Sequence, residues 1–280
     1  MDDAYEKIVP TAWLVAYRRK FSDIPFAKEI FDALDRLRAE RFFEITDEML
    51  VPEMAPQYEA RYKLIDRCIH AQDSQQILEL AAGFAGRGMD MAQNSRVTYV
   101  EFDLPRVMQD KEKIAGELLK GAIQGKLYFE AGNALDYDSL YRAAKHFEKK
   151  PITVINEGLL RYLNFEEKTA VAQNVHKLLE IYGGVWITSD ITLKKILNVD
   201  EKTKAHNKTI AGITGITVDK NRFEDENHAM AFFENLGYSI ERHSFMEVKS
   251  ALVSPRNLNL SDAEVNALID TAVVYIMRLK

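Results

Sequence analysis

From about residue 75 onward, short apolar runs alternate with longer amphipathic segments, and this alternation restricts the possible folds more than any other feature. Runs of strand length occur at 77–81, 97–101, 126–130, 152–155 and 185–189. Segments with helical spacing fill the gaps, at 87–94, 106–120, 137–147 and 165–182. Strands that alternate with helices form right-handed βαβ units, so the pattern predicts a mostly parallel sheet.

The rest of the chain extends this sheet and adds helices before it. Residues 11–72 repeat apolar side chains at steps of three and four, which predicts helices. The mixed segment 191–227 reads as an inserted lid, and strands near 238–241 and at 273–277 follow it. If the last strand returns antiparallel beside its predecessor, the sheet has seven strands. The predicted fold is α/β, a doubly wound, mostly parallel, Rossmann-like sheet.

Local signals within this pattern are specific in two places. Asn164 and Glu167 can form a capping box at the start of the helix 165–182, and Gly183 can end it. The continuously apolar run 152–155 suits a central strand that is buried on both faces. We divide the chain into an N-terminal helical cap at 1–74 and a main domain at 75–280.

Composition excludes several classes of function. A net charge of −6 and a pI near 5.6 argue against a broad nucleic-acid surface. No apolar run approaches the ~18 residues that a membrane span requires. Cys68 is the only cysteine, so an intramolecular disulfide and a thiolate metal cage are ruled out, and the histidines show no metal-ligand spacing. Residues 1–10 lack the pattern of a signal peptide, and we expect a cytoplasmic protein without a metal.

The turn after the first strand has the composition of a ligand-binding loop. Gly83, Gly86 and Gly88 give the spacing G-x-x-G-x-G, whereas the dinucleotide fingerprint is G-x-G-x-x-G. Asp103 ends the second strand 20 residues beyond Gly83, about the distance at which a carboxylate binds ribose hydroxyls. These features favour an adenosine-containing ligand without a pyrophosphate.

This turn and three other segments share a pattern with one enzyme family. The segments are 79–83 with Arg87, then 99–105, then 156–163, and upstream Ala60-Arg61 with Ile65-Asp66. Residues 156–163 read Asn-Glu-Gly-Leu-Leu-Arg-Tyr-Leu and are the most specific part. The chain resembles the leucine carboxyl methyltransferase family of S-adenosylmethionine-dependent O-methyltransferases, over about 60–190, roughly half of its length.

The resemblance implies a class I methyltransferase fold that binds S-adenosylmethionine and releases S-adenosylhomocysteine, with 75–280 as the cofactor domain. Arg61 and Arg87 match the arginines that hold the methionine carboxylate, and a guanidinium suits that group. Glu157 matches the carboxylate at the cationic end of the cofactor. The full set of predicted cofactor residues is Arg61, Glu79, Gly83, Arg87, Asp103, Asn133, Ala134, Glu157 and Gly158.

The sequence departs from the family pattern at two places. Asn133 stands where many relatives carry aspartate beside the adenine, although an amide can still bond the adenine edge. Ala85-Gly86 replaces the Asp-Thr that commonly precedes Arg87. Tyr162 is expected to serve packing.

The predicted reaction is methyl transfer to a carboxylate or hydroxyl oxygen of a small molecule. A carboxylate needs no base, whereas a hydroxyl requires one, for which His206 is a candidate. A protein C-terminal carboxylate is an alternative acceptor, and a nicotinamide-dependent oxidoreductase or a non-catalytic binding protein are alternative functions. Residues 1–55 and 191–227 would select the acceptor but carry no readable motif, and no catalytic residue can be named.

Overall fold

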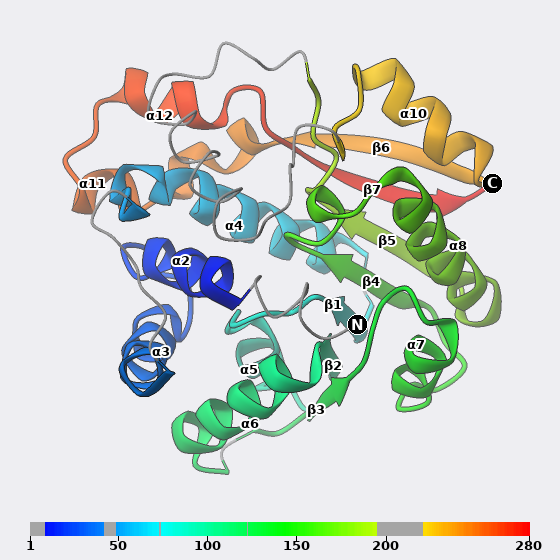
Figure 1. Ribbon diagram of the computed structural model, residues 1–280, viewed down its shortest axis with the longest axis horizontal. Helices are drawn as coiled ribbons and strands as arrows, with labels where there is room; N and C mark the ends of the chain where they lie inside the picture. Colours follow the sequence, from blue (N-terminus) through cyan, green and yellow to red (C-terminus); the bar gives the residue numbers. More distant parts are fainter. Residues whose placement is uncertain (1–8, 42–48, 73, 122, 195–220) are drawn as a thin grey trace.

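The computed structural model describes residues 9–41, 49–72, 74–121, 123–194 and 221–280 (Figure 1). The chain begins with α2 (Val9–Arg19), α3 (Ala27–Arg41), the 3-10 turn η2 (Pro52–Met54) and α4 (Ala55–Ala71). These helices confirm the helical prediction for 11–72 within the described residues.

Seven strands form one sheet, as the sequence predicts, and their order in the sheet is β3-β2-β1-β4-β5-β7-β6. Neighbours among the first five are parallel, and β7 runs antiparallel to both β5 and β6. The fully buried strand β4 lies in the middle of the sheet, which confirms the prediction from its apolar run. The strands are β1 (Gln76–Leu80), β2 (Thr98–Asp103), β3 (Lys126–Ala131), β4 (Ile152–Asn156), β5 (Gly184–Thr188), β6 (Tyr238–Ser244) and β7 (Val273–Leu279).

Helices connect these strands, and those predicted at 87–94, 106–120, 137–147 and 165–182 are present as α5 (Arg87–Met91), α6 (Pro105–Leu119), α7 (Tyr137–Ala144) and α8 (Phe165–Tyr182). The other helical elements are η3 (Leu160–Tyr162), α10 (Glu226–Asn235), η5 (Phe245–Ala251), α11 (Ser254–Asn257) and α12 (Asp262–Ile269). The capping box at the start of α8 is present: Glu167 N donates to Asn164 Oδ1 at 2.9 Å, and Asn164 N donates to Glu167 Oε2 at 2.8 Å. Gly183 follows α8 with φ of 73°, which favours glycine.

Alternate strand residues face two different helical layers, because side chains along a strand point to opposite faces. Leu78 and Leu80 pack with α7, α8 and α10 on one face. Ile77 packs on the other face with residues of α4, η5 and α12. Figure 1 shows α7, α8 and α10 on one side of the sheet and α4, α11 and α12 on the other. Thus α4, from the predicted cap, covers the sheet itself, and the boundary at 74/75 stays a prediction.

Helices α2 and α3 lie beyond the carboxyl ends of β4 and β5 (Figure 1). Their apolar residues share a cluster with α6 and the turn after β1. Gly86 is part of this contact, because a Cβ there would collide with the carbonyl oxygen of Pro25. This packing gives a physical reason for glycine where the family has a larger residue.

Part of the predicted lid at 191–227 lies outside the described residues. His206 belongs to this part. Only its ends are described, and they meet in a bridge between Leu193 and Phe223. In the part of the chain that the structure covers, no helix combines the length and the apolar character needed to cross a membrane.

Candidate active site

A cavity of about 440 Å³ opens at the carboxyl ends of β1 to β4. Parallel sheets of this type bind ligands at that edge. Helix α2 and residues of α4 line the opposite wall. Eight predicted cofactor residues line the cavity, and Arg87 does not; the eight are Arg61, Glu79, Gly83, Asp103, Asn133, Ala134, Glu157 and Gly158.

The first turn is held in place by Asp103. Gly83 N donates to Asp103 Oδ2 at 2.7 Å, and Leu104 N donates to Asp103 Oδ1 at 2.7 Å. Gly83 has φ of 49°, a conformation that glycine adopts without strain. Burial raises the pKa of Asp103, against the two backbone amides that lower it. Each carboxylate oxygen keeps a further lone pair, so the group can accept two hydroxyl hydrogens from the cavity.

Beyond β3, Asn133 and Ala134 form another part of the wall. Asn133 Oδ1 accepts a hydrogen bond from Leu135 N at 3.0 Å, which fixes the side chain. Asn174 Nδ2 donates to the carbonyl oxygen of Ala134 at 3.1 Å. The amide NH₂ of Asn133 therefore remains as the donor that can face a ligand, where an aspartate could only accept.

Glu157 lies at the meeting point of three arginines. It accepts from Arg19, from Arg61 Nε at 2.8 Å and from Arg87 Nη2 at 3.1 Å. Its side chain is only 5% exposed. Burial opposes ionisation, but the three guanidiniums outweigh it and lower the pKa of Glu157. Arg19 and Arg61 line the cavity with Glu157, so cationic donors and an anionic acceptor face the same space.

Arg87 lies behind Glu157 and is fully buried. It donates to Asp66 Oδ1 at 2.6 Å and also to Glu79, and its Cζ lies 4.1 Å from the ring centre of Tyr62. Glu79 also accepts from Tyr99 Oη at 2.7 Å, and its side chain is 2% exposed. The structure therefore connects Arg87 to the cavity through Glu157 and Glu79, which both line it.

A second carboxylate, Asp190, fixes the loop that carries Glu157. Asp190 follows β5, is 3% exposed, and accepts from the backbone N of Gly158 at 2.8 Å and of Leu159 at 2.6 Å. It also accepts from Leu160 N at 3.1 Å and Asn156 Nδ2 at 2.6 Å. A single buried side chain thus sets the backbone of the Glu-Gly-Leu-Leu segment.

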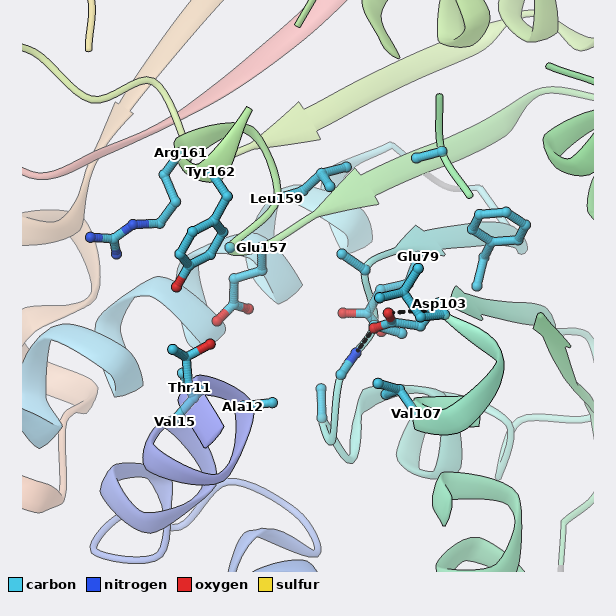
Figure 2. A pocket seen from close by; sticks show the side chains of 18 of the residues that line it. Thr11, Ala12, Val15, Glu79, Asp103, Val107, Glu157, Leu159, Arg161 and Tyr162 are labelled. Atoms are coloured by element: carbon cyan, nitrogen blue, oxygen red, sulfur yellow. Dashed lines mark hydrogen bonds between the residues drawn. The ribbon is translucent and has the colours of Figure 1, made fainter. Parts of the chain in front are cut away.

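The cavity continues past Glu157 toward α2 and η3. Figure 2 shows Arg161, Tyr162, Thr11 and Val15 on one side of Glu157, with Asp103, Glu79 and Val107 on the other. Tyr162 lines the cavity, and its role in packing stays a prediction.

Basic side chains surround Tyr58 at the end of the cavity near α2 and η3. Its hydroxyl accepts from Arg18 Nη1 at 2.9 Å. Burial raises the pKa of Tyr58, but Arg18, Arg61 and Arg161 together outweigh it and lower the pKa. Three guanidiniums therefore act on the Tyr58 hydroxyl at this end of the cavity.

Several residues of the site were not predicted from the sequence, namely Arg18, Arg19, Tyr58, Arg161 and Asp190. Arg18 and Arg19 form a basic pair in a largely apolar helix, and Asp190 is a polar residue directly after a strand. Both patterns are signals that could have been used. Among the described residues, no group of three histidine, cysteine, aspartate or glutamate side chains could hold a metal.

Comparison with known proteins agrees with the resemblance. The sequence model described as leucine carboxyl methyltransferase matches residues 13–176, which is more than half of the 280 residues. No curated protein is similar to the chain in sequence.

Solved structures share the fold at low sequence identity. The methyltransferase domain of bacterial CtHen1 (CtHen1-CN) has a TM-score of 0.53 and 13% identity, over 80% of this chain and 100% of that one. Magnesium protoporphyrin IX methyltransferase (ChlM) from Synechocystis PCC 6803, a structure with bound SAH, has a TM-score of 0.51 and 13% identity. That match covers 89% of this chain and 94% of ChlM. At such identity these likenesses concern the fold alone.

Proposed function

Because the chain belongs to the leucine carboxyl methyltransferase family and is thus an S-adenosylmethionine-dependent methyltransferase, we propose that it methylates a carboxylate oxygen of a small acid. The observation that carries this proposal is the cavity itself. One end holds the predicted cofactor residues, and the other is surrounded by arginines. A volume of about 440 Å³ is that of a small-molecule site.

The residues present fit the cofactor group by group. Asp103 has lone pairs for two ribose hydroxyls, and Asn133 offers an amide NH₂ to the adenine edge. Glu157 would hold the cationic amino group, while Arg19 and Arg61 would hold the methionine carboxylate. Arg87 would act indirectly, by holding Glu157 from behind, together with Glu79.

When bound, S-adenosylmethionine supplies a methyl group on a sulfonium: an acceptor oxygen lone pair forms the new C–O bond while the S–C electron pair stays on sulfur, leaving neutral S-adenosylhomocysteine. The protein's part is to bind both reactants in the correct orientation and to exclude water. Helix α2 and η3 form the walls that would do so. We propose the N-terminal unit 1–74 as the acceptor side and 75–280 as the cofactor domain.

The cavity favours a carboxylate acceptor over a hydroxyl, because a hydroxyl needs a base. Among the described residues that line it, there is no histidine and no lysine. Its carboxylates are already held: Glu79 by Arg87, Asp103 by backbone amides and Glu157 by arginines. Glu167 caps α8. An ionised carboxylate needs no base, and the surrounding guanidiniums would attract it.

The test is transfer of a labelled methyl group to a panel of small acids and to the corresponding alcohols. A methyl ester releases methanol in mild base, whereas a methyl ether is stable, so base treatment identifies the oxygen that was methylated. We expect a base-labile product from acids, absent with Asp103→Ala.

A base-stable product would contradict the proposal and indicate a hydroxyl acceptor. Label in peptide C-termini but in no small acid would identify a protein carboxylate as the acceptor. Calorimetric titration with S-adenosylmethionine and NAD serves as the cofactor control, and binding of NAD alone would refute a methyltransferase.

A further inference from the structure

Arg161 differs from the other arginines of the cavity because it has no ionic or hydrogen-bond partner among the described residues. Arg19 and Arg61 donate to Glu157, and Arg18 donates to Tyr58. Arg161 has only a ring contact, with its Cζ 5.7 Å from the ring centre of Tyr162. Its Nε atom is buried, and no hydrogen-bond acceptor in the described part of the chain reaches it.

The buried Nε donor of Arg161 is costly unless an acceptor compensates it. The forked donors of arginine match a carboxylate or phosphate, either of which supplies such an acceptor. Tyr58 is not a dedicated partner of Arg161, because its hydroxyl accepts a hydrogen bond from Arg18 and its interaction with positive charge is shared among Arg18, Arg61 and Arg161. The protein thus maintains a positive, half-buried donor that lines the end of the cavity.

The position of Arg161 separates it from the atoms that would hold the cofactor. In Figure 2 its guanidinium lies on the far side of Tyr162 from Glu157, and Asp103 lies at the opposite end. A side chain at such a position can set the acceptor specificity without contacting the groups proposed to hold the cofactor.

We propose that Arg161 binds a second anionic group of the methyl acceptor, so that the substrate is a small acid with two anionic groups. This inference rests on the proposed function, in which one carboxylate is methylated. The second group, a carboxylate or a phosphate, stays ionised and is recognised by Arg161. Arg161 is therefore a specificity-determining residue.

The first experiment measures binding without turnover. Protein saturated with S-adenosylhomocysteine is titrated calorimetrically with dicarboxylates from succinate to adipate, with monocarboxylates of the same chain length, and with phosphorylated acids. A charge-assisted hydrogen bond corresponds to about 10-fold or more in affinity, so the dianions should bind at least about 10-fold more tightly than the monoanions. Tighter binding of the phosphorylated acids would identify phosphate as the second group.

The second experiment uses variants. Arg161→Gln should abolish the preference for dianions, because the loss of affinity should be at least about 10-fold larger for dianions than for monoanions, while Arg161→Lys should retain part of the preference. Arg96→Gln, an exposed arginine before β2, is the matched control. Thermal melting of each variant shows whether it is folded.

Three results would overturn the inference: equal binding of mono- and dianions, no binding of any acid, or an equal loss for both classes in Arg161→Gln. Failure of the proposed function looks different. In that case dianions bind in an Arg161-dependent manner, but no acid yields a base-labile methyl ester.

Discussion

Replacing Glu157 with glutamine removes the charge on which three arginines depend. The amide keeps the volume of the side chain, so the change is mainly electrostatic. Breaking a buried ion pair by removing one partner costs about 3–5 kcal/mol. We expect the free energy of unfolding at pH 7 to fall by up to about this amount. The loss should be smaller than this upper limit because Asp66 and Glu79 still pair with Arg87 when Glu157 is neutral.

The sign of the pH dependence follows from the pKa of Glu157. Burial alone would raise this pKa, but the arginines lower it below the ordinary value of 4.5. The carboxylate therefore stabilises the fold fully above pH 4.5, and this contribution is lost as the pH falls through that value toward the folded pKa. The difference between the wild type and Glu157→Gln should be complete at pH 7 and shrink below about pH 4.5.

Cofactor affinity should fall as well. Loss of a hydrogen bond to a charged group costs about 1.5–3 kcal/mol, which corresponds to a rise in Kd of about 10- to 150-fold. S-adenosylmethionine should lose more than S-adenosylhomocysteine, because only the former carries a sulfonium. Calorimetric titration gives both constants, and denaturant unfolding gives the stability. Glu148→Gln, in an exposed pair with Lys150, is the control. A folded Glu157→Gln protein that binds S-adenosylmethionine with wild-type affinity would refute the reasoning.

Three further changes test the supporting residues. In the wild type, the Asp103 carboxylate accepts hydrogen bonds from two backbone N–H groups, and Asp103→Asn would place an amide NH₂ against one of them. The affinity for S-adenosylmethionine, measured by calorimetry, should therefore fall about 10-fold or more. An unchanged Kd would exclude a ribose contact. Asp190→Asn disturbs four hydrogen bonds, so the free energy of unfolding should fall by about 1–3 kcal/mol, and the cofactor affinity should fall as well. A variant of unchanged stability that binds the cofactor weakly would mean that Asp190 does not act through the fold of the loop. Burial raises the pKa of Asp66 to about 6 from 3.8, so ionising this carboxyl destabilises the fold as the pH rises through that window. The stability advantage of the wild type over Asp66→Asn should therefore decrease between pH 4 and pH 6 in denaturant titrations, by at most about 3 kcal/mol, and an increase would contradict this sign.

Local patterns determined the elements of the fold. The strand β4 is continuously apolar because it is buried on both faces, and its sequence alone placed it at the centre of the sheet. The ends of α8 were likewise predictable, since Asn164, Glu167 and Gly183 act on their own neighbours along the chain. The glycines after β1 and Asp103 indicated the ligand site, because the carboxyl ends of parallel strands meet at one edge.

Contacts between distant segments decided the composition of the site. Arg19 reaches Glu157 across 138 residues, and only the docking of α2 brings the two together. Arg87 matched the family pattern by position, yet the half-buried Asp66 and the buried Glu79 hold it behind the wall of the cavity. Pairing of charges depends on the three-dimensional distance and on burial, neither of which is encoded in local spacing. The sequence by itself therefore determined the sheet, the family and the cofactor, whereas the tertiary structure decided which arginines face the cavity.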